Sequence, residues 1–281
     1  MDLNKHSMII TEPIKVEKIA IAINNLSPHL SGIKIVQLSD LHYDGIRLTA
    51  PTLLRAIALS NEVNPDLVLI TGDFVTDNPQ PIDELATHLQ NLKSKYGVYG
   101  CLGNHDLIPK SAGQQIIRAL GKIKLKILWN EVAYPLGEDL AIAGLPDFGS
   151  REFKPAPVLE QIPLDTPRIV LSHNPDSASV LKNWRVDLQL SGHTHGGQIV
   201  IPNYGSVVSI LPKIRQYVPK SLRDRLPYIK DCAKITQHWN WSQGWHQVGT
   251  NQLYINRGLG SYLPGRFNCP PEVTVITLEC R

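Results

Sequence analysis

Two histidines separated by a single residue, His193 and His195, have the side chains and the spacing to ligate a metal ion. They lie in the glycine-rich stretch 190–197, where this spacing is typical of a strand end or a tight loop rather than of a helix face. Glycine permits positive φ and close approach of the backbone, so that both imidazoles could reach one site. The alternative is an ordinary surface loop that holds two histidines, and the motif alone does not decide between them.

Further metal-ligand side chains follow four other apolar runs of the sequence. The runs span 33–38, 67–70, 98–102 and 169–171, and the side chains that follow them are Asp40, His42, Asp73, Asn104, His105, Asp106 and His173. In open α/β sheets, ligands bind at the carboxyl ends of the strands. We therefore expect side chains that are far apart in the sequence to meet at one site.

The ligand types indicate hard or borderline divalent cations. Carboxylate, imidazole and amide groups suit Mn²⁺, Fe or Zn²⁺, and cysteine, the mark of a structural zinc site, is missing from the set. The candidate ligands exceed what one tetrahedral ion needs, since they are Asp40, His42, Asp73, Asn104, His173, His193 and His195. The surplus predicts two cations, which together could stabilise the attacking and the leaving oxygen of a displacement reaction.

The elements that carry these side chains alternate between strands and helices in the first part of the chain. Isoleucine and valine alternate with charged residues over 14–23, as in an edge strand, and the apolar run 33–38 is typical of a strand covered on both faces. A strand over 67–70 and a helix over 81–92 follow, an order that predicts an α/β fold. Between the strands over 33–38 and 67–70, Thr49 and Pro51 mark the start of a helix. We expect the buried stripe of this helix to be Leu53, Leu54, Ile57 and Ala58.

The order changes after residue 104. A helix predicted over 111–120 is followed by two segments, 125–134 and 140–145, that we expect to form a hairpin. Later strands are predicted over 168–171, 187–190, 198–201, 253–256 and 273–278. Together these elements predict a second sheet with antiparallel members.

Length and composition describe a soluble globular protein. The chain of 281 residues is 42% hydrophobic and 19% charged, and we interpret it as a single domain over 1–281 with an insertion at about 207–249. A net charge of +3 is too small to predict nucleic-acid binding. The four cysteines show no C-x-x-C spacing, and the sequence has no apolar run of about 20 residues. Charges within 1–23 argue against a signal peptide. These features together predict a cytoplasmic location.

The positive charge is concentrated in one segment. Residues 210–238 contain seven lysines and arginines and two aspartates, a local charge of +5 against −2 for the remaining residues, and Trp239, Trp241 and Trp245 follow at once. Basic residues next to aromatic ones fit a surface over 210–245 that meets anionic lipid at the inner face of a membrane. The alternative is a solvated lid with its tryptophans packed inward.

Taken in order, the motifs closely resemble the signature of the calcineurin-like metallophosphoesterase superfamily: Asp40-x-His42, Gly72-Asp73, Gly103-Asn104-His105-Asp106, His173 and Gly192-His193-x-His195. The resemblance runs from about residue 33 onward and implies a four-layer αββα sandwich of two mixed β-sheets with flanking helices. It implies one cation held by Asp40, His42, Asp73 and His195, and a second held by Asp73, Asn104, His173 and His193. A hydroxide between the cations, which Asp73 would bridge, would attack phosphorus.

The resemblance also implies roles beside the metals. His105 would lie next to the phosphate and stabilise charge or protonate the leaving oxygen, a role typically worth ~10² to 10⁴ in rate. Asp106 would orient His105 or cap the following helix. In some relatives an acidic residue three positions after the bridging aspartate supports the catalytic histidine; here Thr76 occupies that position and Asp77 follows, so the supporting residue is left open.

The end of the chain narrows the resemblance. The motifs at 256–260, 264–266 and 270–272 look like those of a bacterial branch that includes membrane-associated phosphodiesterases and a UDP-2,3-diacylglucosamine pyrophosphohydrolase of lipid A synthesis. Arg257 and Arg266 in these motifs are candidate contacts for the substrate phosphate, because a guanidinium group matches phosphate oxygens. A structural role for both arginines is the alternative.

These observations predict a metal-dependent phosphohydrolase with two divalent cations, with Mn²⁺ preferred and Fe or Zn²⁺ as alternatives. We expect a phosphodiester or pyrophosphate substrate, and a lipid-linked nucleotide sugar such as UDP-2,3-diacylglucosamine is the sharper hypothesis. The alternative enzyme is a broad-specificity phosphodiesterase or phosphatase acting on soluble nucleotides or phosphoproteins. A non-catalytic scaffold that kept the fold would be marked by lost ligands, and the sequence keeps all of them.

Overall fold

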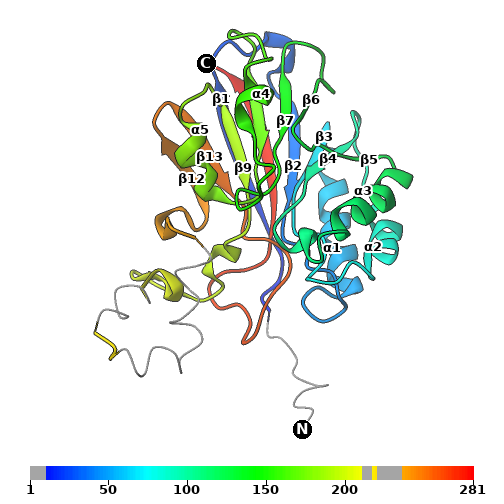
Figure 1. Ribbon diagram of the computed structural model, residues 1–281, viewed down its shortest axis with the longest axis vertical. Coiled ribbons are helices and arrows are strands. Elements are labelled where there is room, and N and C mark those ends of the chain that lie inside the picture. Colours follow the sequence, from blue (N-terminus) through cyan, green and yellow to red (C-terminus); the bar gives the residue numbers. More distant parts are fainter. Residues whose placement is uncertain (1–10, 211–216, 220–235) are drawn as a thin grey trace.

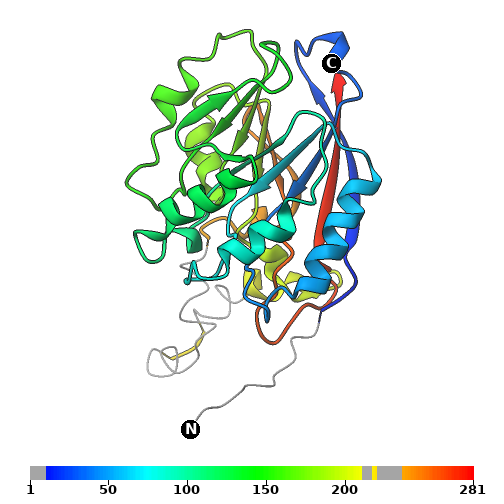
Figure 2. The ribbon, with the colours of Figure 1, turned by 90° about the vertical axis from the view of Figure 1, so that its right-hand side faces the viewer.

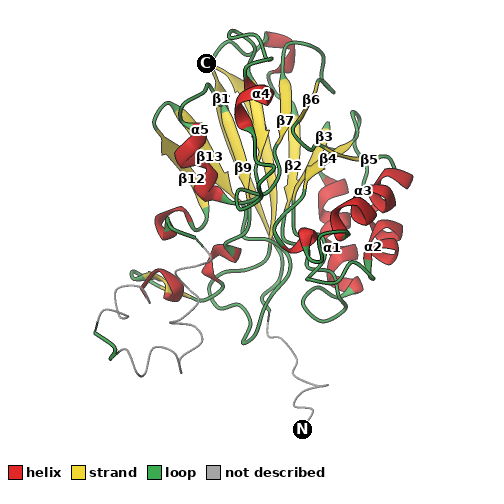
Figure 3. Cartoon of the chain, viewed as in Figure 1, coloured by secondary structure: helices red, strands yellow, loops and turns green. Residues whose placement is uncertain are grey.

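Two six-stranded sheets form the centre of the molecule in a computed structural model, which describes residues 11–210, 217–219 and 236–281 (Figure 1). The sheets lie face to face and the helices lie on the outside (Figure 3). This is the four-layer αββα sandwich that the sequence predicted.

The first sheet has the strand order β1-β14-β2-β3-β4-β5. Its strands are β1 (Lys15–Ile23), β14 (Glu272–Cys280), β2 (Lys34–Leu38), β3 (Leu67–Thr71), β4 (Val98–Cys101) and β5 (Leu125–Ile127). Only the pairing of β14 with β2 is antiparallel, so β2 to β5 all point the same way. The carboxyl ends of β2, β3 and β4 therefore lie at one edge of the sheet.

The second sheet has the order β12-β13-β9-β8-β7-β6. Its strands are β12 (Gly244–Val248), β13 (Asn251–Ile255), β9 (Leu188–Ser191), β8 (Arg168–Leu171), β7 (Ala141–Gly144) and β6 (Glu131–Ala133). The central strands β13, β9, β8 and β7 are parallel, and the two outer pairings are antiparallel. A separate ribbon pairs β10 (Val200–Ile201) with β11 (Gly205–Ser206).

Helices cover the outer face of each sheet, as Figure 2 shows for the first one. The first sheet packs against α1 (Ala50–Glu62), α2 (Ile82–Leu89) and α3 (Ala112–Lys122), and the second against the short helices α4 (Pro155–Leu159) and α5 (Ala178–Leu181). Alternate residues of β2 serve different layers: Ile35 lies in the core between the sheets, whereas Val36 lies under the helices. Residues 35–38 of β2 are buried on both faces, which explains why a nearly unbroken apolar run predicted this strand.

Two local predictions were wrong. In α1 the buried residues are Leu53, Ala56, Ile57 and Ser60, and Leu54 is 44% exposed, because the helix is rotated relative to the predicted stripe. The predicted hairpin is divided between the sheets: β6 and β7 pair as expected, but 125–127 joins the first sheet as β5, parallel to β4. Three residues of alternating burial do not reveal which sheet they will join.

The basic residues of the predicted insertion lie outside the described residues. Within the described part of 207–249, Gly244–Val248 belongs to the second sheet as β12, Trp239 is buried, and Trp245 is 50% exposed. None of the helices in the described ranges has the length and hydrophobicity of a transmembrane segment.

Candidate metal centre

Five parallel strands bring the candidate ligands together. Asp40 and His42 follow β2, Asp73 follows β3, and Asn104 follows β4; in the second sheet His173 follows β8, and His193 and His195 follow β9. Gln37 fixes the two sheets relative to each other just before the ligands, because its Nε2 donates to Thr71 Oγ1 at 3.1 Å and to the Ser191 carbonyl at 2.9 Å. Convergence at strand ends was the central expectation from the sequence.

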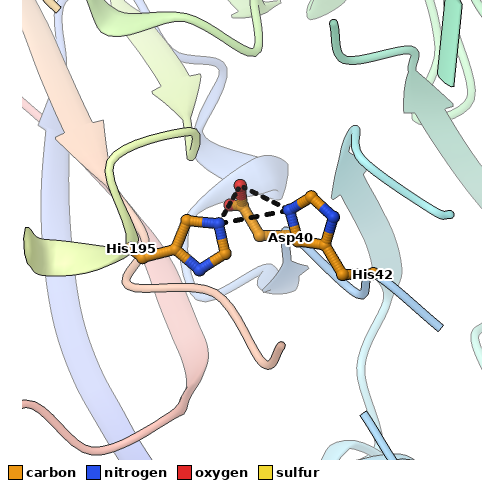
Figure 4. Close-up of side chains that lie close together, drawn as sticks. All are labelled: Asp40, His42 and His195. Carbon is orange, nitrogen blue, oxygen red and sulfur yellow. Dashed lines mark hydrogen bonds and ion pairs between the residues drawn. The ribbon is translucent and has the colours of Figure 1, made fainter. Parts of the chain in front are cut away.

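Asp40, His42 and His195 form the first group (Figure 4). The Nε2 atoms of the two histidines are 3.2 Å apart, and Asp40 Oδ1 lies 3.5 Å from His195 Nε2 and 4.0 Å from His42 Nε2. All three side chains are buried. Two ring nitrogens and a carboxylate oxygen that face one another in a buried site are suited to a shared cation.

Asp73, His173 and His193 form the second group. His173 Nε2 lies 3.0 Å from Asp73 Oδ2 and 3.2 Å from His193 Nδ1. Asp73 Oδ2 is also only 3.4 Å from His42 Nε2 of the first group. A single carboxylate oxygen therefore faces nitrogen ligands from both groups.

Asn104 adds an oxygen ligand that the protein itself does not satisfy. Its Oδ1 is buried and has no hydrogen-bond partner among the described residues. A buried acceptor without a partner costs free energy, so such an atom is expected to have a ligand. The donor set of carboxylates, imidazoles and one amide oxygen fits divalent cations such as Mn²⁺, Fe²⁺ or Zn²⁺.

The backbone at the ligands is held in an uncommon conformation. Five of the seven have positive φ, namely Asp40 (48°), His42 (43°), Asp73 (53°), His193 (72°) and His195 (52°). Residues other than glycine rarely adopt this region, and its strain is typical of functional sites whose surroundings fix the chain. Close glycine contacts provide part of that fixation, since a Cβ on Gly192 would lie 2.2 Å from Asp40 Oδ2.

Hydrogen bonds orient the histidine rings toward the centre. Nδ1 of His173 donates to the Thr71 carbonyl at 2.7 Å, and Nδ1 of His195 donates to the Gly260 carbonyl at 3.1 Å. A carbonyl oxygen only accepts, so in the neutral rings the lone pair is on Nε2. This outer contact sets the tautomer that a metal ligand needs.

Burial and charge set the protonation of these rings. Burial holds the pKa of His42 well below its usual value and lowers the pKa of His195 to about 4, which keeps both rings neutral. Burial opposes a charge on His173 as well, but the adjacent Asp73 carboxylate raises the pKa of His173 to about 10. A cation bound at Asp73 would compete with that proton, because metal ligation requires the neutral ring.

His105 lies at the edge of both groups. Its backbone N–H donates to Asp73 Oδ1 at 2.9 Å, and its ring meets the His42 ring edge-on with centroids 4.9 Å apart. Its Nδ1 lies 2.6 Å from Asp77 Oδ1, so Asp77 is the acidic partner that the sequence left open. In some relatives the supporting acidic residue lies one position earlier, so the sequence did not identify the pair of His105 and Asp77. The only indication of this pair in the sequence was that Asp77 is the first carboxylate after that position.

Asp106, which we expected to orient His105 or to cap the following helix, binds backbone N–H groups of two loops. Both carboxylate oxygens accept backbone N–H groups: Oδ1 from Phe74 at 2.8 Å and Val75 at 3.2 Å, and Oδ2 from Gly103 at 2.9 Å. Burial, followed by the nearby Asp73 charge, raises the pKa of Asp106 to about 7. Asp106 thus joins the loop after β3 to the loop after β4 and positions Asp73 and Asn104.

Both arginines that are candidates for a phosphate contact have partners within the protein. Arg257 forms ion pairs with Glu17 at 2.8 Å and with Glu272 at 2.7 Å. Arg266 is 3% exposed, and its guanidinium donates to Ser261 Oγ and to the carbonyls of His195, Arg257, Gly258, Gly260 and Cys269. These contacts agree with the structural alternative, and a contact of either arginine with the substrate phosphate stays a prediction.

Comparisons with known proteins agree with this geometry. The family model for calcineurin-like phosphoesterases matches residues 33–197. The chain is 32% identical to the metallophosphoesterase YkuE of Bacillus subtilis, covering 91% of this chain and 82% of that one, and 32% identical to the phosphodiesterase YaeI of Escherichia coli, covering 87% and 82%. It is 28% identical to the UDP-2,3-diacylglucosamine pyrophosphatase LpxG of Chlamydia muridarum, covering 88% and 84%.

Among solved structures, a dimetal phosphatase from Danio rerio has a similar fold. The TM-score is 0.50 at 11% sequence identity, over 82% of this chain and 88% of that one. At this identity the likeness concerns the fold alone.

Proposed function

The chain belongs to the calcineurin-like phosphoesterase family, and on that premise we propose that it hydrolyses phosphodiester or pyrophosphate bonds at a dinuclear metal centre joined by Asp73. As a member of this family, the protein is a metal-dependent phosphohydrolase. The observation that carries the dinuclear proposal is the position of Asp73 Oδ2, 3.0 Å from His173 Nε2 and 3.4 Å from His42 Nε2.

Each cation would have four ligands from the chain. Asp40, His42, Asp73 and His195 would hold the first cation, and Asp73, Asn104, His173 and His193 would hold the second. When bound, two such cations neutralise charge on phosphate oxygens and lower the pKa of a coordinated water. We propose that both cations are Mn²⁺, since oxygen and imidazole ligands without a thiolate suit this ion.

The chain's own residues position the substrate and move the proton. Asp77 accepts the Nδ1 hydrogen of His105 and fixes the ring, so that Nε2 is the atom left to contact a phosphate or leaving-group oxygen. The backbone N–H of His105 on Asp73 Oδ1 ties this ring to the bridging carboxylate. Asp106 keeps the loops after β3 and β4 in register, which holds His105 and Asp73 at a fixed separation.

We propose a lipid-linked nucleotide sugar as the physiological substrate class. The relative LpxG is described as a UDP-2,3-diacylglucosamine pyrophosphatase, and the phosphodiesterase YaeI supports the diester class. Exposed apolar side chains of the described residues support an amphiphilic substrate: Ile201 is 41%, Leu263 49% and Phe267 59% exposed. Backbone hydrogen bonds between Phe267 and residues 198 and 200 place this surface beside the loop that carries His195.

Hydrolysis assays with the Mn²⁺-loaded protein test the proposal. It should cleave bis(p-nitrophenyl) phosphate faster than p-nitrophenyl phosphate, and it should release UMP and lipid phosphate from UDP-2,3-diacylglucosamine. Asp73→Asn should abolish both reactions, whereas Asp83→Asn, which changes an aspartate 70% exposed on α2, should not. Turnover of small diesters alone would refute the lipid substrate and favour a broad-specificity phosphodiesterase; no loss in Asp73→Asn would refute the site.

A further inference from the structure

An arginine stacked on a tyrosine lies next to the metal centre and has no part in the ligand set. The guanidinium carbon of Arg47 is 4.7 Å from the centre of the Tyr262 ring. The same ring contacts three histidines of the centre, with centroid distances of 5.1 Å to His42, 5.3 Å to His195 and 6.3 Å to His105. Tyr262 thus contacts both the Arg47 guanidinium and the histidines of the metal centre.

The backbone holds this pair in place. Tyr262 N donates to Gln198 Oε1 at 2.6 Å, directly after the loop that carries His195, and Ser261 N donates to the Arg47 carbonyl at 3.0 Å. Asp44 accepts the backbone N–H groups of Ile46 and Arg47 and forms an ion pair with Arg47 Nη1. Asp44 therefore fixes one edge of the guanidinium group, and no described residue accepts a hydrogen bond from its other edge.

Both side chains keep hydrogen-bond donors for a ligand. Among the described residues, Arg47 Nε and Nη2 have no hydrogen-bond acceptor, and the side chain is 32% exposed. The Tyr262 hydroxyl lies 3.3 Å from His42 Nδ1. Thr76 Oγ1 lies 3.1 Å from the same nitrogen. When His42 uses its Nε2 lone pair for a cation, Nδ1 carries the ring hydrogen and cannot accept one, so the hydroxyl hydrogen of Tyr262 is left for another acceptor.

Arg266 shows what a purely structural arginine looks like in this molecule. It is 3% exposed, and its guanidinium is surrounded by five backbone carbonyls and a serine hydroxyl. Arg47 differs in each respect, because it is partly exposed, engaged at one edge and stacked on a ring that faces the metal ligands.

We propose that Arg47 and Tyr262 form a subsite for a second phosphate group, adjacent to the one that reacts, and so select pyrophosphate-linked substrates over simple diesters. The inference rests on the proposed function. A guanidinium fork and a phenol hydroxyl are complementary to phosphate oxygens, and stacking on the ring orients the fork. A diester with neutral substituents has no second phosphate group to accept hydrogen bonds from Arg47 and Tyr262. The two residues therefore determine specificity for pyrophosphate-linked substrates.

Two substrates that differ in the second phosphate test the subsite. The ratio of kcat/KM for UDP-N-acetylglucosamine to that for bis(p-nitrophenyl) phosphate should fall by about tenfold or more in Arg47→Ala, the loss expected for one charge-assisted hydrogen bond, chiefly through KM. Tyr262→Phe should lower the ratio by a smaller factor because the stacked ring remains. Arg55→Ala on α1 is the matched control: Arg55 is 62% exposed and pairs with Glu62, so the ratio should not change.

A binding measurement separates this inference from the proposed function. In the His105→Ala background with Mn²⁺, isothermal titration calorimetry should show weaker binding of UDP-N-acetylglucosamine after Arg47→Ala than after Arg55→Ala. The subsite would be overturned if Arg47→Ala and Arg55→Ala bound UDP-N-acetylglucosamine equally well, or if the kcat/KM ratio did not change in Arg47→Ala. It would also be overturned if the protein with an intact Arg47 bound no UDP-N-acetylglucosamine. If neither substrate is hydrolysed but Arg47→Ala still weakens binding, the proposed function fails and the subsite stands.

Discussion

Gly103 lies so close to Asp73, the residue that we propose to bridge the cations, that adding one methyl group should disrupt the metal centre. A Cβ on residue 103 would lie 2.2 Å from Asp73 Oδ1 and 2.7 Å from the Asp73 backbone nitrogen, whereas ordinary van der Waals contact begins at 3.4 Å. Gly103→Ala therefore requires Asp73 to move by ~1 Å, and metal–ligand distances tolerate only about 0.2 Å. We expect a loss of about 10² in kcat and about 1–3 kcal/mol of stability.

Metal analysis after dialysis against Mn²⁺, kcat on bis(p-nitrophenyl) phosphate and the Tm together measure this effect. Gly121→Ala is the matched control, since no described atom beyond the neighbouring residues and the local backbone of α3 lies within 4 Å of its Cβ position. It should keep both cations and gain about 0.5–1 kcal/mol of helix stability. If Gly103→Ala binds two ions per chain and turns over at the wild-type rate, Asp73 does not occupy the bridging position and the reasoning is refuted.

Three further predictions concern the site and its support. His105→Ala should lower kcat by about 10² to 10⁴ while metal content stays at the wild-type value; a loss of metal instead would make His105 a ligand. Exhaustive chelation should abolish turnover and lower the Tm, and Mn²⁺ should restore both, since the buried Asp40 and Asp73 carboxylates face the cations; activity that survives chelation would contradict the metal requirement. Arg266→Met should cost roughly 3 kcal/mol in urea denaturation because buried carbonyls lose their donor, whereas a phosphate contact would raise KM and leave stability unchanged.

The sequence could predict that the candidate ligands lie close together, because their positions follow from the direction of the strands. Once β2, β3 and β4 are parallel, the residues after them meet at one edge, whatever their distance in the sequence. The same holds for His173 and His193 after β8 and β9. Apolar or nearly apolar runs identified β2, β3 and β8 because both faces of these strands are covered.

Features that depend on a single tertiary partner could not be predicted. The role of Arg257 is set by Glu17, 240 positions away, and Arg266 is satisfied by carbonyls of loops whose conformation the sequence does not specify. The pair of Arg47 and Tyr262 is likewise formed by segments that lie far apart in the chain. The strand β5 lies at the edge of the first sheet beside β4, and no pattern within 125–127 indicates this position.

Two cations that share the Asp73 carboxylate would be visible by anomalous diffraction at the manganese edge, from crystals grown with MnCl₂. We expect two peaks, one among Asp40, His42 and His195 and one among Asn104, His173 and His193, with Asp73 in contact with both. A single peak, or two peaks of which only one contacts Asp73, would contradict a shared carboxylate.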